Sequence, residues 1–548
     1  MRSTFAKVLS TTSLVVLFAI LLLLIFLDRN INYYLHNSNV PAFNNFTLAC
    51  AAILLFSFAI IACRHIAYNK SLHFLKKMSE LRFLMVCAGL CILTLIVQCA
   101  IAYNIGFKTG WDPGEITTIA LFDPPLEGQL SDWQYEYLSR YPNNRFLLAM
   151  LIGIRSLAQF FGLGSAYSAW VLSSCVAVSM SCFFLTRIIY QLSKNRSTAL
   201  AGFLLSIALV GLSPWFLVPY TDSFGLFFTS FALWVYVCLN KNTYIKWILF
   251  SLICLLGYQI KPTVIIVFLA AIFIEILSLS KSRQQLKKSL AKALCIILGF
   301  AIATITSNVL IEKLGVNYNE ERSFSMAHYA MMGLNCETNG CVSGEDGEFS
   351  AGKQTYQDRI EANIDVISER LDNYGILGLA KHLTKKMLCT YNDGTFGWAG
   401  EGGFFKDVVD RTSPFADLLR NIYYPSGEHY RLFCTSQQFF WIFTLMGIIL
   451  NFPQILFCKE SRKIASKKDS DLLVILLSII GITLFILIFE GRARYLYLYS
   501  GFFVIASTVG FSSFANAIAF KKHNPSAQSN NSSTRVSKIQ KQKTTSSF

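Results

Sequence analysis

Residues 145–163 read RFLLAMLIGIRSLAQFFGL, and the topology of the whole chain depends on whether this stretch crosses a lipid bilayer. Its length and apolar content approach those of a transmembrane helix, for which about 20 residues are needed. However, Arg155 and Gln159 stand in its middle. Burying an arginine at the centre of a bilayer costs about 3 kcal/mol or more, so we expect this stretch to lie along the outer membrane surface as a helix.

The rest of the chain has the composition of a polytopic membrane protein. Of its 548 residues, 54% are hydrophobic and only 15% are charged, and the mean hydropathy is +0.47. A soluble protein of this length exposes far more polar surface, whereas lipid can cover this much apolar side chain. The sequence therefore predicts an all-α polytopic membrane protein with about 12 transmembrane helices. The predicted spans are 8–27, 43–63, 83–103, 165–186, 199–219, 224–239, 247–260, 263–279, 289–312, 436–457, 472–489 and 495–519.

The basic residues set the direction of these spans. The net charge is +16, but lysine and arginine stand in short clusters between apolar runs, as membrane flanks do, so we reject nucleic acid as a partner. If 145–163 does not cross, all of these clusters fall on one face, which the positive-inside rule makes cytoplasmic. Both termini are then on the cytoplasmic side of a plasma membrane. The polar tail 521–548 is predicted to be disordered.

This topology divides the chain into five parts. They are an N-terminal extra pair of spans at 1–82, a membrane core at 83–312 with a first extracytoplasmic loop at 104–164, a large extracytoplasmic loop at 313–435, C-terminal spans at 436–520 and a basic cytoplasmic tail at 521–548. In an oxidising compartment, the spacing of Cys336 and Cys341 in the large loop allows a disulfide, while the pairing of Cys389 and Cys434 stays open.

Charged side chains stand close to the predicted outer ends of the spans. The first outer loop opens with GWDPGE (110–115), in which Pro-Gly predicts a turn at the interface. This turn holds Asp112 and Glu115 near the lipid boundary, where they are candidate catalytic carboxylates. The alternative is a solvated turn before an acidic helix N-terminus. The same loop ends in a polar run that is either a plain helix start or part of a substrate site, with the candidates Arg140, Tyr141, Asn143 and Asn144.

Two middle turns add an acid and a lysine on the same side. Asp222 closes the short turn PYTD (219–222) between two predicted spans. Lys261 stands between two further spans that are both short, so it is either a buried functional lysine or an end residue that snorkels to the surface.

The last outer turn, EGRARYL (490–496), is the most specific signal. It carries Glu490, Arg492 and Arg494 on the face where the positive-inside rule disfavours arginine. Two guanidinium groups at this spacing can bind an anion such as phosphate. Carboxylates that accept a proton, together with cations that hold a phosphate leaving group, indicate transfer from a membrane-embedded phosphate ester.

In their order and common side, these motifs resemble the GT-C superfamily of glycosyltransferases that use lipid-linked sugars. The nearest likeness is to its family-39 branch, which includes protein O-mannosyltransferases and bacterial aminoarabinose transferases. The likeness extends over about residues 83–510 and includes HYAMMGLN (328–335), with His328 as a further candidate, YNDGTF (391–396), and Tyr495. These later segments indicate a bacterial variant.

The resemblance implies a GT-C-like fold and a function. A sugar would pass, with inversion, from a polyprenyl phosphate to a hydroxyl of an extracytoplasmic glycan or protein. A loop carboxylate would act as base, Lys261, Arg492 and Arg494 would hold the donor phosphate, and the large loop would cap the acceptor. The chain departs from the family pattern because Pro-Gly separates its two acids. We favour Asp112 as the base because it precedes the turn and lies nearer the membrane.

Two other functions fit parts of the pattern. A polysaccharide polymerase or ligase, which takes an undecaprenyl diphosphate donor, also has many spans and a late outer loop, but the outer carboxylate pair argues against it. A lipid or sugar transporter of the flippase type favours internal repeats and charges at mid-membrane, whereas these charges gather at one face. No cofactor is predicted. A divalent metal at Asp112 and Glu115 stays open, because two carboxylates are too few to define a site.

Overall fold

The computed structural model describes Leu75 and residues 2–27, 39–68, 77–239, 243–279, 282–400, 403–409, 411–452 and 467–523. Within these ranges the regular elements are all helices, and a single β-bridge pairs Lys108 with Lys406. A helix satisfies its own backbone hydrogen bonds, which long apolar segments in lipid require. The predicted all-α class is therefore confirmed.

Seven of the described helices are long and apolar enough to cross a membrane. They are α1 (Arg2–Phe26), α4 (Glu80–Ile105), α8 (Ala166–Ser193), α10 (Thr221–Cys238), α13 (Arg283–Glu312), α18 (Tyr430–Ile449) and α20 (Lys467–Ile488). Shorter apolar helical stretches at Asn45–Ile61, Arg196–Gly211, Tyr244–Ile260 and Pro262–Leu277 overlap further predicted spans. The total of about 12 spans stays a prediction.

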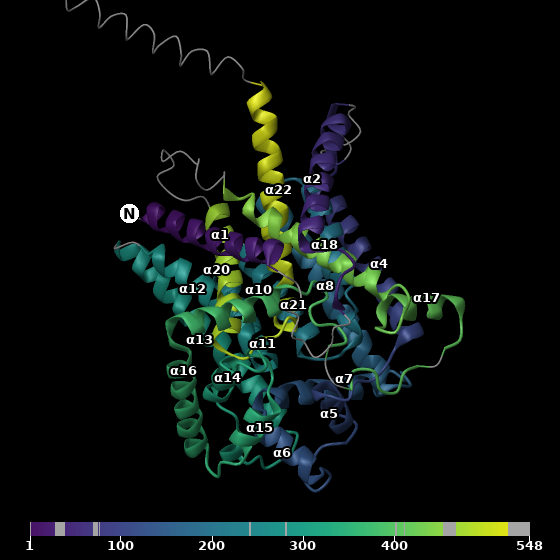
Figure 1. Cartoon of the computed structure of the whole chain (residues 1–548), viewed down its shortest axis with the longest axis vertical. Coiled ribbons are helices and arrows are strands. Elements are labelled where there is room, and N and C mark those ends of the chain that lie inside the picture. Colours follow the sequence, from purple (N-terminus) through teal and green to yellow (C-terminus); the bar gives the residue numbers. More distant parts are fainter. Residues whose placement is uncertain are drawn as a thin grey trace, which may run out of the picture.

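The remaining helices complete one body around a continuous apolar core. The other helices that overlap predicted spans are α2 (Asn45–Tyr68), α9 (Arg196–Ser206), α11 (Thr243–Ile260), α12 (Ile265–Leu277) and α22 (Ser500–His523). The two predicted loops form α5 (Asp112–Ile119), α6 (Asp132–Arg140), α7 (Arg145–Phe160), α14 (Met326–Gly333), α15 (Gly344–Ala351), α16 (Tyr356–Tyr391) and α17 (Pro414–Tyr423). In Figure 1, α5, α6 and α15 lie at one end of the body and α22 leaves it at the other.

The stretch that decides the topology is α7. This helix has 16 residues and is not among the described helices of membrane-spanning dimensions. The guanidinium of Arg155 donates to the carbonyl of Leu121 and pairs with Asp123, so the first loop satisfies its charge. Leu157 and Phe160 are exposed. This division into a packed face and an apolar exposed face supports a place along the membrane surface, which stays a prediction.

Several predicted spans differ from the observed helices. The predicted span 199–219 stops being helical after Gly211, and Pro214 opens a separate 3-10 turn, because proline lacks the N–H that would continue the helix. The predicted span 495–519 is also interrupted: α21 (Arg494–Tyr497) ends before α22 begins. Helix α18 begins earlier than the predicted span 436–457. The predicted disordered tail lies outside the described residues from 524 onward.

Candidate functional site

A cavity of about 330 Å3 lies where the ends of several helices meet. Residues from the start of α5, the turn Pro142–Asn144, the start of α10, the turn Pro262–Val264, α14, the end of α20 and α21 line it. The structure thus brings together polar turns that are far apart in the sequence. The predicted site residues that line the cavity are Asp112, Tyr141, Asn143, Asn144, Lys261, His328, Glu490, Arg492, Arg494 and Tyr495.

Two cations of the cavity wall share one buried carboxylate. Asp222 is 1% exposed; its Oδ1 accepts a hydrogen bond from Lys261 Nζ, and its Oδ2 lies 3.4 Å from Arg494 Nη1. Arg494 Cζ lies 4.5 Å from the centre of the Trp111 ring, and Lys261 Nζ lies 4.6 Å from that of Tyr495. Asp222 therefore holds the positively charged ends of Lys261 and Arg494 close together at the cavity wall. Two cationic groups in one place can both contact an anionic ligand.

A break between two apolar helices positions Lys261. Helix α11 ends at Ile260, because a residue that precedes proline is disfavoured in the helical conformation. Lys261 is extended, with φ −150° and ψ 116°, and Pro262 opens a 3-10 turn. The ammonium group therefore meets Asp222 in the first turn of α10. A similar break between α20 and α21 carries Glu490 and Arg492.

Asp112 opens α5 and contributes a carboxylate to the lining. Its Oδ2 accepts a 3.2 Å hydrogen bond from Tyr220 OH. Burial, with a contribution from Asp112, raises the pKa of Tyr220 well above its ordinary value, so this hydroxyl stays a donor. Trp111 Nε1 and Thr263 Oγ1 also belong to lining residues and have no hydrogen-bond partner among the described residues. Buried polar groups of this kind indicate a place for a ligand or water.

Several hydrogen bonds hold the EGR turn (490–492) in place. Glu490 accepts hydrogen bonds from Arg492 Nε at 2.7 Å and from Tyr495 OH at 3.1 Å. Its own amide donates to the carbonyl of Tyr329 on α14 at 2.9 Å. Because both oxygens of Glu490 are engaged, this carboxylate positions Arg492 and Tyr495 at the cavity.

Lys386 on α16 supports the same turn, although no motif in the sequence singles it out. Its buried Nζ donates to the carbonyl oxygens of Gly333 at 2.8 Å, Leu487 at 3.2 Å and Phe489 at 2.5 Å. Burial lowers the pKa of Lys386 to about 8. This ammonium therefore ties the end of α14 to the end of α20, and so holds two sides of the cavity together.

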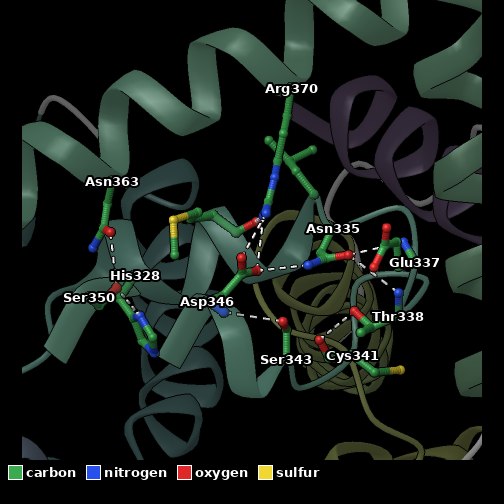
Figure 2. A network of polar contacts seen from close by, with 12 residues as sticks. His328, Asn335, Glu337, Thr338, Cys341, Ser343, Asp346, Ser350, Asn363 and Arg370 are labelled. Atoms are coloured by element: carbon green, nitrogen blue, oxygen red, sulfur yellow. Dashed lines mark hydrogen bonds and ion pairs between the residues drawn. The ribbon is translucent and has the colours of Figure 1, made fainter. Parts of the chain in front are cut away.

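His328 belongs to the wall that α14 contributes. Its Nδ1 lies 2.7 Å from Ser350 Oγ, which in turn donates to Asn363 Oδ1 at 3.0 Å. Figure 2 shows this chain of contacts from α14 through α15 to α16. Burial lowers the pKa of His328 to about 4, so the imidazole is neutral at pH 7. A neutral imidazole offers one N–H donor and one nitrogen acceptor and carries no positive charge.

An ion pair at the centre of Figure 2 holds α15 against α16. Arg370 donates to both oxygens of Asp346, at 2.7 and 3.0 Å, and Asn335 Nδ2 donates to Asp346 at 3.1 Å. Arg370 also reaches the carbonyl of Met331 on α14 at 2.6 Å. These bonds position α14, and with it the wall that contains His328 and Tyr329.

Replacing Asp346 with Ala should lower the free energy of unfolding by about 2 kcal/mol at pH 7, because it leaves Arg370 without its carboxylate. Burial raises the pKa of Asp346, but the hydrogen bonds from Arg370 and Asn335 outweigh it and leave the pKa below its ordinary value. The native pair therefore stabilises fully above the unfolded pKa of about 3.9, and this contribution is lost as the pH falls through the folded pKa.

Thermal unfolding in detergent between pH 7 and pH 3 measures this effect. The difference between native protein and variant should shrink at the acid end. Asp365→Ala is the matched control, because Asp365 is exposed on the same helix, α16. Equal destabilisation by the two substitutions, or a difference that does not depend on pH, would contradict the role of the Asp346–Arg370 pair.

Residues 5–514 match a family described as "Conserved hypothetical integral membrane protein". The chain belongs to this family. No curated protein and no solved structure matches it. Together with the seven helices of spanning dimensions, membership identifies an integral, multi-pass membrane protein whose apolar helices contact the bilayer.

In this integral membrane protein, three predicted site residues do not line the cavity. Glu115 lies further along α5 from Asp112. Arg140 pairs with Glu136 at 2.8 Å, and its Cζ lies 5.9 Å from the centre of the Phe324 ring. Asp222 lies behind the lining, where it pairs with two lining cations. A contact with substrate therefore stays a prediction for all three.

The described residues give no further support to a metal or a disulfide. They contain no group of three or more His, Cys, Asp or Glu side chains placed to hold a metal ion. A metal shared by Asp112 and Glu115 stays a prediction, and only Asp112 lines the cavity. The Cys336–Cys341 disulfide that the sequence allows is not formed in the structure, where Cys336 is a free, exposed thiol.

Proposed function

We propose that this protein is a glycosyltransferase that moves a sugar from a polyprenyl-phosphate donor to a hydroxyl of a cell-envelope glycan or protein. The observation that carries the proposal is the meeting of Asp112 with Lys261, Arg492 and Arg494 around one cavity. A carboxylate and a group of cations in one enclosed space match the two needs of the reaction, which are a proton acceptor and a stabilised phosphate leaving group.

The cation side of the cavity is the proposed place of the donor phosphate. Lys261 and Arg494 converge on Asp222, and Arg492, which Glu490 positions, adds a further guanidinium to the lining. Trp111 Nε1 and Thr263 Oγ1 are nearby donors whose hydrogen-bonding capacity no described residue uses. The oxygens of a phosphate group can accept hydrogen bonds from lysine, arginine and neutral donors of this kind at the same time.

Asp112 is the proposed base. It would accept the proton of the acceptor hydroxyl while the acceptor oxygen forms a bond to the anomeric carbon. The bond from that carbon to the phosphate oxygen would break, and its electron pair would leave with the polyprenyl phosphate. Attack from the side opposite to the phosphate inverts the anomeric centre. Trp111 precedes Asp112 in the chain, and its ring lies 4.5 Å from Arg494 Cζ, so the proposed base and the proposed phosphate site border the same indole.

The remaining lining suits a lipid-linked carbohydrate. Aromatic rings of Trp111, Tyr141, Tyr220 and Tyr495 surround the polar groups, and such rings pack against sugar faces. Phe485, near the end of the candidate span α20, gives the cavity an apolar border. The site therefore has both a polar region for a sugar phosphate and an apolar edge next to a membrane helix.

Purified protein incubated with polyprenyl-phosphate sugars and envelope glycan or protein acceptors tests the proposal. We expect a glycosylated product and one released polyprenyl phosphate for each transfer, both identified by mass. Sugar diphosphate lipids are the matched control. Turnover of diphosphate donors alone would favour the polymerase or ligase, and lipid movement across vesicles without a covalent product would favour the transporter.

A further inference from the structure

Helix α16 carries the most exposed large apolar side chains of the described chain. Ile376 is 89% exposed and Leu377 is 86% exposed. They follow Gly375, whose φ of +53° and ψ of −174° interrupt the helix. Glycine adopts this conformation readily, so the sequence permits a sharp corner at this position. Adjacent apolar side chains at a corner of this kind indicate a surface that another apolar phase covers.

The corner lies near the end of a membrane-spanning helix. The chain is helical from Ile376 to Lys386, so these residues are separated by about 15 Å along the axis. Lys386 Nζ binds the carbonyls of Leu487 and Phe489 at the end of α20, which has the dimensions of a span. Ile488 at that same end is 54% exposed, as expected of a side chain that faces lipid. Figure 1 shows α16 at the edge of the body.

The charges on either side of the corner differ in sign. The part of α16 that precedes it has the exposed acids Glu369 and Asp372. The part that follows it has Lys381, which is exposed, and Lys385. Lysines beside apolar side chains that insert into a bilayer can pair with its anionic headgroups. The acidic segment before the corner is instead expected to be in water.

We propose that the corner of α16 inserts Ile376 and Leu377 into the bilayer leaflet on the cavity side, with Lys381 among the phospholipid headgroups. Residues next to this corner also contact the end of α14, which contributes to the cavity wall. Tyr374 OH donates to the carbonyl of Leu334 at 3.0 Å, and His382 Nε2 donates to that of Gly333 at 3.0 Å. The bilayer thus holds the end of α14 in place, whatever reaction the cavity carries out.

A fluorescent probe at the corner tests the insertion. Leu377→Cys is prepared in the full chain with Cys50, Cys63, Cys336, Cys341 and Cys458 changed to Ser, labelled with an NBD maleimide and placed in vesicles of phosphatidylcholine and phosphatidylglycerol. The parent chain with these five serines and no added cysteine gives the background labelling. Glu369→Cys is the matched control on the same helix. We expect the probe at 377 to show blue-shifted emission, quenching by nitroxide lipids and protection from iodide, and the probe at 369 to show the reverse. Both positions are exposed, so neither change opens a cavity in the core.

Two results would overturn the proposal. Equal iodide quenching at 377 and 369 in vesicles would place the corner in water. Protection at 377 that appears only at high protein density, with energy transfer between labelled molecules, would show that a second copy of the chain covers it. Unfolding temperatures in detergent that match the parent protein confirm that both labelled variants are folded.

Discussion

Sugar transfer by an Asp112→Asn variant is expected to be about a thousandfold slower in kcat than transfer by the native protein. A positioned general base contributes about 10²- to 10⁴-fold. The amide keeps the size of the carboxylate and still accepts the hydrogen bond from Tyr220 OH, but it cannot take the acceptor proton. Single-turnover transfer with a radiolabelled polyprenyl-phosphate sugar measures the chemical step directly. Donor binding should change little, because Lys261, Arg492 and Arg494, the proposed phosphate ligands, are unchanged in this variant.

Glu115→Gln is the control for this experiment. Glu115 shares α5 with Asp112 but does not line the cavity, so its removal should change kcat by no more than about twofold. The result also decides which of the two carboxylates is the base, which their spacing in the sequence leaves open. Native turnover in Asp112→Asn, or an equal loss in Glu115→Gln, would refute the assignment of Asp112. Membrane insertion and unfolding temperature of both variants should match the native protein.

The sequence was sufficient to find much of the cavity because its signals are local. Lys261 precedes a proline between apolar runs, and the EGR turn interrupts two apolar helices. Interruptions of this kind end helices wherever they occur, so they gather at the ends of the spans. The basic clusters indicate the direction of each span. Polar turns on the same side of the membrane are then expected at the same end of the helix bundle. The all-α class followed from composition for a similar reason.

The partners of these residues could not be predicted, because they are long-range pairs. Asp222 meets Lys261 across 39 positions and Arg494 across 272. Nothing in the sequence around Asp222 distinguishes a ligand-binding acid from one that holds a lysine and an arginine side chain in place. Arg140 is a predicted site residue that does not line the cavity. It precedes Tyr141 in the chain, but on helix α6 it pairs with Glu136 instead.

Lys386 illustrates a further limit. In the sequence it is one of two adjacent lysines near the end of a long amphipathic segment, which usually indicates a solvated helix face. Only packing shows that Lys386 is buried against carbonyl groups at two helix ends. Unpaired carbonyls at helix termini require donors, and a lysine from a distant helix can supply them. Sequence motifs therefore do not predict the role of Lys386, although its hydrogen bonds hold two sides of the cavity together.

Arg494→Ala is expected to raise the donor Kd by about 10- to 100-fold. A hydrogen bond to a charged group contributes about 1.5–3 kcal/mol, and the guanidinium faces the proposed phosphate position from a buried site. The variant should still fold, because Asp222 keeps Lys261 as its partner. Binding of a fluorescent polyprenyl phosphate gives the Kd, and the unfolding temperature reports any loss of structure separately.

Two further variants separate phosphate binding from a structural role of Arg494. Arg494→Lys keeps the charge beside Asp222 but loses the two-pronged geometry, so it should restore the unfolding temperature and only part of the affinity. Arg431→Ala removes an exposed arginine of α18 and should leave the Kd unchanged. If Arg494→Ala lowered the unfolding temperature while donor binding stayed native, Arg494 would serve only to neutralise Asp222. The phosphate would then have to bind at Arg492 or Lys261, and the same titration of Arg492→Ala would decide between them.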